Sequence, residues 1–99
     1  MKYFRGYWIH QNEIDPIAYY LEVDAFRDTV RMVEVMPNGE LRPYSKDDAN
    51  RGALVETTPL PEASEINSNP ELAIVEIKRD IFERIWEKSR STFLGDQAR

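Results

Sequence analysis

The fold is decided by a stretch that begins at Thr29 and reads TVRMVEVM, followed directly by PNGE at positions 37–40. β-Branched and long apolar side chains alternate in it with charged ones, and a period of two is typical of a strand. An Asn-Gly pair placed just after such a run is a strong hairpin signal. Two strand-like runs precede this stretch and a short one follows it, so we expect an interior strand of a small sheet.

Three further runs complete the predicted sheet. Residues 3–10 are rich in aromatic strand formers, and residues 17–24 alternate cleanly. After the turn, residues 41–44 form a fourth strand, in which Pro43 suits an edge position. Residues 79–89 form the one long helix, because apolar side chains recur there at helical spacing. The prediction is an α+β fold, a four-stranded antiparallel meander in the order 1-2-3-4 with the C-terminal helix packed on one face.

The 99 residues suffice for one domain with a modest core. We expect this domain over residues 1–89, with residues 90–99 as a frayed tail. A long loop at 45–71, dense in Ser, Asp, Asn, Gly and Pro, separates the sheet from the helix. Connections of this length in a compact domain are usually functional or mobile, so the loop belongs among the candidate functional elements.

Composition narrows the classes of function. The net charge of -5 argues against a nucleic-acid-binding protein, because binding phosphates needs a concentrated basic face. The chain has no cysteine, which removes disulfides, thiolate catalysis and sulfur-ligated metals. No apolar run approaches the roughly 20 residues that span a bilayer, and no phosphate-binding glycine loop or calcium loop is present. We therefore expect a cytoplasmic protein with no cofactor, no metal, no nucleic-acid partner and no membrane partner.

Turn lengths align the predicted strands and assign side chains to the two faces. A two-residue turn at Asn38-Gly39 sets Val33 opposite Tyr44, and similar alignments set Glu22 opposite both Arg31 and Arg5. One face is then apolar, and we expect the helix to pack on it. The residues of that apolar face are Phe4, Trp8, Ile17, Tyr19, Leu21, Val23, Val30, Met32, Met36 and Leu41.

The opposite face combines charges with tyrosines. Its candidate binding residues are Arg5, Tyr7, Tyr20, Glu22, Arg31 and Tyr44. Because Tyr and Arg are enriched at interface hot spots, this face is a candidate for contact with a protein partner or with a second copy of the chain. The competing interpretation is an ordinary solvated sheet face whose charges pair with one another.

A second candidate site is a cleft between sheet and loop formed by Trp8, His10 and Glu34. His10 is the only histidine, and Glu34 falls on the apolar face beside Tyr19 and near Trp8. A carboxylate among apolar side chains needs a partner and is common at functional sites. A structural role, in which Glu34 bonds the Trp8 indole or a hydroxyl, is the competing interpretation. This cleft would suit a small-molecule binder or a weak hydrolytic enzyme.

Several short motifs in a fixed order carry a resemblance to a known family. They are WIH at 8–10, YLEVD at 20–24, RMVE at 31–34, the Asn38-Gly39 pair, Pro61, NPE at 69–71 and FERIW at 82–86. The chain resembles a family of small bacterial proteins known only as a domain of unknown function, over nearly its whole length to about residue 88. It departs from the family at the helix start, where KRDI stands at 78–81 in place of Ser or Thr before two acidic residues. The resemblance implies no activity.

The sequence thus predicts a non-enzymatic protein-binding module that uses an open sheet face and the 45–71 loop. No catalytic residue is assigned. Some small acidic α+β proteins of this style are immunity proteins that accompany toxins, and that comparison is an analogy of style.

Overall fold

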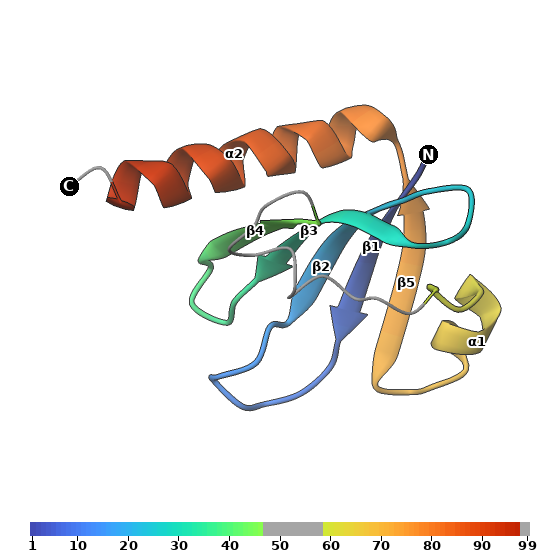
Figure 1. Ribbon diagram of the computed structural model, residues 1–99. Coiled ribbons are helices and arrows are strands. Elements are labelled where there is room, and N and C mark those ends of the chain that lie inside the picture. The colour runs from blue at the N-terminus through green and yellow to red at the C-terminus, as the bar shows by residue number, and fades with distance from the viewer. Residues whose placement is uncertain (47–58, 98–99) are drawn as a thin grey trace.

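The computed structural model describes residues 1–46 and 59–97, with side chains described up to residue 91. The elements in chain order are β1 (Lys2–Trp8), β2 (Ala18–Val23), β3 (Thr29–Val35), β4 (Leu41–Ser45), α1 (Ala63–Asn67), β5 (Leu72–Ile77) and α2 (Arg79–Gln97). The strands form one antiparallel sheet in the order β4-β3-β2-β1-β5, and α2 lies across one end of it (Figure 1).

The predicted class, an α+β fold with an antiparallel sheet and a C-terminal helix, is confirmed. The sheet has five strands instead of four, because residues 72–77 form β5 and pair with the free side of β1. Helix α2 extends to Gln97, past the predicted end at residue 89. Of the predicted 45–71 loop, residues 47–58 lie outside the described residues, and the later part contains α1. No helix in the described ranges has the length and apolar character to cross a membrane.

Helix α2 packs on the face opposite to the one predicted. The ring of Phe82 is fully buried and lies 5.3 Å from the ring of Tyr3, centroid to centroid. Trp86 stacks on Phe82 at 6.3 Å, and Val33 of β3 completes this buried cluster. Tyr3 and Val33 share a sheet face with Arg31, so the helix covers part of the face that was predicted to be open.

The other face has its own apolar cluster and a different cover. The cluster contains Phe4, Leu21, Val23, Met32, Tyr44 and Ile74. Leu60, Ala63 and Ile66, from α1 and the segment before it, pack against this cluster. The prediction that α2 covers this face was wrong because the chain supplies a second apolar layer from the segment that was read as a loop. Each sheet face therefore has a core of its own.

The turn between β3 and β4 has three residues instead of two. The Gly39 N–H donates to the Met36 carbonyl at 2.8 Å, and the Met36 N–H donates to the Glu40 carbonyl at 2.9 Å. Gly39 has a φ of 90°, the left-handed conformation that closes three-residue hairpins. The extra residue shifts β4 by one position, so Val33 faces Pro43 and Tyr44 projects from the opposite face.

The pairing of β1 with β2 differs from the prediction by two positions. Arg5 lies opposite Tyr20, and Tyr3 lies opposite Glu22. The connection between the strands spans residues 9–17, longer than the predicted one, and this length sets the register. A shift of two keeps each side chain on its predicted face. It nevertheless separates Arg5 from the carboxylate that was predicted to face it.

On each outer strand, part of the backbone that faces away from the sheet is unavailable for pairing with a further strand. In β4, every second residue forms its backbone hydrogen bonds with β3. By this alternation the backbone nitrogen of Pro43 lies on the outer side, where a proline has no N–H to offer. In β5, the Asn67 side chain accepts the outward N–H of Ile74 at 2.7 Å and donates to its carbonyl at 3.1 Å. Asn67 thus occupies the place of a neighbouring strand at the middle of β5.

Candidate functional site

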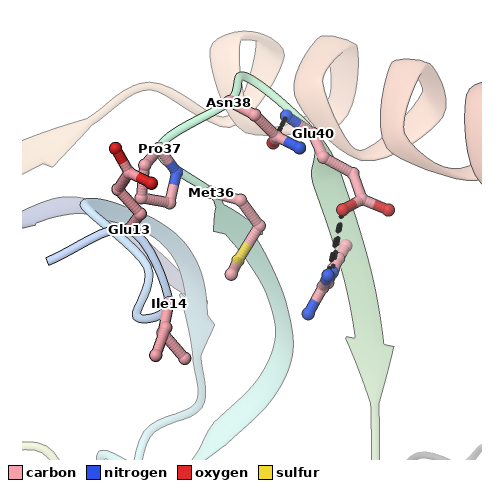
Figure 2. Close-up of a pocket in the computed structure, with 7 residues that line it drawn as sticks. Glu13, Ile14, Met36, Pro37, Asn38 and Glu40 are labelled. Atoms are coloured by element: carbon pink, nitrogen blue, oxygen red, sulfur yellow. Dashed lines mark hydrogen bonds and ion pairs between the residues drawn. The ribbon is translucent and has the colours of Figure 1, made fainter.

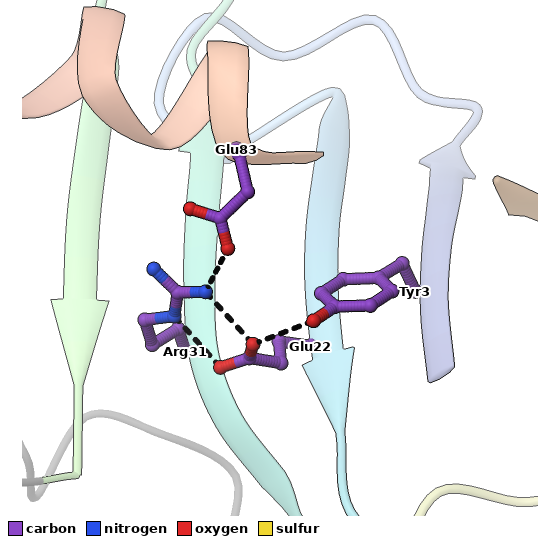
Figure 3. A network of polar contacts seen from close by, with 4 residues as sticks. All are labelled: Tyr3, Glu22, Arg31 and Glu83. Carbon is purple, nitrogen blue, oxygen red and sulfur yellow. Dashed lines mark hydrogen bonds and ion pairs between the residues drawn. The ribbon is translucent and has the colours of Figure 1, made fainter. Parts of the chain in front are cut away.

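A four-residue polar network joins α2 to the sheet (Figure 3). Both oxygens of the Glu22 carboxylate accept hydrogen bonds from Arg31, each at 2.7 Å. Glu22 also accepts from the Tyr3 hydroxyl at 3.1 Å, and Glu83 of α2 accepts from the Arg31 guanidinium. Glu22 is only 6% exposed, so the network is built into the interface between helix and sheet.

The electrostatics of this network follow from its hydrogen bonds. Arg31 holds the pKa of Glu22 below its ordinary value, against the opposing effect of burial. Burial and the Glu22 carboxylate both raise the pKa of Tyr3. The Arg31 guanidinium also lies 5.0 Å from the rings of Phe82 and Trp86, an arrangement that favours a cation over an aromatic face. Glu22 and Arg31, two of the predicted binding residues, therefore hold α2 in place.

Another part of this sheet face stays accessible to solvent beside α2. Beside the covered part lie Arg5, Tyr7, Tyr20, Ala73 and Val75, which we call the open half-face; Tyr20 forms its border, because it also packs against the cluster that contains Phe82 and Trp86. Tyr7 is 39% exposed and Val75 is 48% exposed. Three of the predicted binding residues, Arg5, Tyr7 and Tyr20, are thus brought together on a surface that solvent reaches.

Arg5 has an unusual setting within the open half-face. Its guanidinium carbon lies 5.3 Å from the centre of the Tyr7 ring. The hydroxyl of Tyr20, and then that of Tyr7, raises the pKa of Arg5, while partial burial lowers it. The Arg5 Nε is buried and has no hydrogen-bond partner among the described residues. A half-buried cation is therefore surrounded by rings and hydroxyls.

Tyr44 does not belong to this surface. It projects from the α1 side of the sheet, is 7% exposed, and packs in the cluster with Met32 and Phe4. The sheet itself separates Tyr44 from Arg5 and Tyr7, so placing Tyr44 with them was wrong. The one-residue shift in the turn between β3 and β4 is the cause.

The residues of the predicted cleft lie on one side of the sheet without forming a reactive group. His10 Nε2 bonds the Pro16 carbonyl at 2.8 Å, and the His10 ring meets Trp8 edge-on at 4.6 Å. Glu34 lies opposite Tyr19 in the β2–β3 pairing, and burial followed by the Glu34 charge raises the pKa of Tyr19. No hydrogen bond or ion pair in the described part of the chain joins His10 to Glu34.

A shallow pocket of about 660 Å³ opens beside the β3–β4 turn (Figure 2). It is lined by Glu13, Ile14, Met36, Pro37, Asn38, Glu40 and Arg42. Glu40 and Arg42 pair at 3.0 Å, so the charges nearest the turn are already satisfied. No group of three side chains suited to a metal lies together within residues 1–46 and 59–91. The pocket holds neither member of the predicted cleft pair, His10 and Glu34.

Sequence reasoning missed the part of the open half-face that β5 provides. Ala73 and Val75 come from the run LAIVEI at 72–77, which is short, apolar and β-branched. That composition is a strand signal. It was overlooked because the run falls between a long loop and a helix, where no turn signal marks a hairpin.

The fold and this surface define a small α+β protein whose C-terminal helix covers only half of one sheet face. The chain belongs to the family described as a domain of unknown function, DUF6881, whose model matches residues 2–91. This match confirms the resemblance to a domain of unknown function that the sequence motifs indicated. Neither a curated protein nor a solved structure shows significant similarity to the chain.

Proposed function

We propose that the protein is a non-enzymatic binding module whose open half-face contacts a partner protein. The supporting observation is the contrast within one sheet face. Helix α2 seals the half that contains Tyr3 and Val33, whereas Tyr7 and Val75 stay exposed beside the half-buried Arg5. Tyrosine and arginine are enriched at binding hot spots, and a tyrosine offers a large contact area with little conformational freedom to lose.

The alternative, a small-molecule binder or weak hydrolytic enzyme in a cleft with His10 and Glu34, has less support from the geometry. His10 is engaged by the Pro16 carbonyl and by Trp8, which is an arrangement that anchors the β1–β2 connection. A general base needs a nucleophile or a water site within reach and a group that orients it. Three pockets that lie among the described residues have linings that contain neither His10 nor Glu34.

The open half-face carries this proposal without the 45–71 loop. Arg27 ties the described end of that loop by donating to the carbonyls of Leu60 at 2.7 Å and Pro61 at 2.8 Å. Leu60 packs on the face opposite to Arg5.

For the cellular location we propose the cytoplasm, with the cysteine-free composition as support. An immunity-like role remains an analogy of style.

The test is a quantitative pull-down from the source cell with the full chain as bait. A Tyr7→Ser/Val75→Ser double variant removes the apolar part of the open half-face, and Phe26→Ser, which changes an 80% exposed ring in the β2–β3 turn, is the matched control. Circular dichroism must first show all three chains to be folded. We expect one near-stoichiometric partner that wild type and Phe26→Ser retain and that the double variant loses. A partner retained by all three chains would refute the site, and the absence of any partner would refute the function.

A further inference from the structure

Among the arginines that the structure shows at least partly buried, Arg5 differs from the others in its partners. Arg27 lies 3.6 Å from Glu62, Arg31 lies 2.7 Å from Glu22, and Arg42 lies 3.0 Å from Glu40. Arg5 makes no ion pair with any described residue. Buried polar groups are normally satisfied within the fold, so a partly buried arginine without an anionic partner needs an explanation.

Among the described residues, the immediate surroundings of Arg5 provide hydroxyl oxygens and apolar surface but no acceptor of full charge. Tyr7 and Tyr20 flank the guanidinium, and the neighbours across the β1–β5 pairing are Ala73 and Val75. Arg5 is the one charged side chain in the open half-face as defined above. Its buried Nε has no hydrogen-bond partner in the described chain, so the chain itself does not complete the hydrogen bonding of this guanidinium.

We infer that the open half-face binds a protein segment that presents one carboxylate, from Asp, Glu or a chain terminus, among apolar side chains, and that Arg5 receives this carboxylate. This inference rests on the proposed function and adds the chemistry of the partner. The guanidinium matches a carboxylate with two parallel hydrogen bonds, and the hydroxyls of Tyr7 and Tyr20 lie beside it as further donors.

The balance of charge favours a carboxylate over a phosphate. A phosphorylated side chain carries roughly two negative charges at neutral pH. The open half-face offers one cation, and the exposed groups around it, Tyr7 and Val75, are an aromatic and an aliphatic side chain. A single carboxylate neutralises Arg5, whereas a phosphate would leave an excess charge on an apolar surface.

The inference is tested with a displayed library of random peptides. The library is selected on the full wild-type chain and counter-selected on the folded Tyr7→Ser/Val75→Ser variant. Peptides that also bind the variant are discarded, so the peptides that remain use the open half-face. We expect the surviving peptides to share an Asp or Glu flanked by apolar residues. A synthetic peptide of the consensus sequence and its analogue with the acid replaced by Gln or Asn are then measured by fluorescence anisotropy.

Three substitutions at Arg5 distinguish a specific ion pair from general attraction. Arg5→Gln should weaken the affinity for the consensus peptide by about tenfold or more, because the hydrogen-bonded carboxylate of the peptide loses its charged partner. Arg5→Lys should restore part of the affinity, since it keeps the charge and loses the planar fork. Arg5→Glu should prefer the peptide whose acid is replaced by Lys. The control Arg84→Gln alters an exposed arginine on α2 and should leave affinity unchanged.

Each outcome supports or overturns the inference. Surviving peptides that lack an acid, or that bind Arg5→Gln as well as wild type, overturn it while the proposed function stands. If no peptide survives counter-selection, both the inference and the proposed function are overturned. A wild-type chain that sediments as a dimer and becomes monomeric on Arg5→Gln would make the occupant a second copy of the chain, and the inference of a separate partner would fall.

Discussion

Arg31 and Arg5 project from the same face of the same sheet, yet their surroundings are opposite. Arg31 is held by the carboxylates of Glu22 and Glu83 and lies over two rings of the core. Arg5 has two tyrosines beside it and no carboxylate among the described residues. Helix α2 brings Glu83 and both aromatic rings to Arg31, and the pairing of β2 with β3 brings Glu22. The two halves of this face should therefore respond differently to mutation.

The largest difference is expected for apolar side chains. Phe82→Ala should lower the free energy of unfolding by about 3–5 kcal/mol, the usual cost of removing a fully buried phenyl ring. Val75→Ala in the open half-face should cost less than about 1 kcal/mol, since half of that side chain is already in water. Urea titrations of both variants measure the two values. Equal losses would mean that the open half-face is part of the core.

The next largest effect is expected at Arg31. Arg31→Met leaves the buried Glu22 carboxylate without its main partner, and we expect a loss of about 2–3 kcal/mol, below the range for fully buried pairs because Arg31 is partly exposed. The double variant Arg31→Met/Glu22→Gln removes the unpaired charge and should recover part of this loss. If the double variant is less stable than Arg31→Met alone, the pairing energy has been assigned to the wrong residues.

Acid should lower the stability of the fold through Glu22, which lies where α2 covers the sheet. The folded-state pKa of Glu22 is lowered from 4.5, so the unfolded chain binds more protons in acid. The stabilisation is therefore present above about pH 4.5 and is lost as the pH falls through the folded-state pKa. Urea midpoints measured between about pH 6 and pH 3 should fall more steeply for wild type than for Arg31→Met, in which Glu22 loses the cause of its shift. Parallel curves would contradict this account.

The smallest effect is expected at Arg5. Arg5→Met should change the free energy of unfolding by no more than about 0.5 kcal/mol, because this arginine forms no ion pair in the described chain. The same urea titration measures it, with Arg31→Met as the comparison. A loss above about 2 kcal/mol would show that Arg5 supports the fold, and would weaken its assignment to binding.

The residues that sequence reasoning located correctly share short connections. Glu22 was predicted to face Arg31, and it does, because only a short turn separates the two strands. The Asn38-Gly39 turn was also located correctly, but its length was wrong. Pro37 is the missed signal, since proline at the second position and glycine at the fourth favour the four-residue turn that begins at Met36.

The choice of face for α2 was less predictable. Alternation assigns Tyr3 and Phe4 to opposite faces, but both are buried aromatics, so β1 does not indicate which face the helix covers. The decision depends on Leu60 and Ile66, which cover the Phe4 side from a segment without a clear period. Long-range competition between two apolar layers for one sheet has no local signature. The unpaired state of Arg5 follows from that competition and from the register of β1.

The terminated outer strands also bear on how the protein behaves when it is crowded. A sheet whose outermost backbone groups are unoccupied can recruit strands from other chains and grow into fibres. Here Pro43 interrupts one side, and the Asn67 amide occupies the centre of the other through bonds of 2.7 and 3.1 Å. An exposed apolar surface normally carries a risk of aggregation. Because strand addition is hindered at these two points, the chain can expose Tyr7 and Val75 to water at a lower risk of fibre growth.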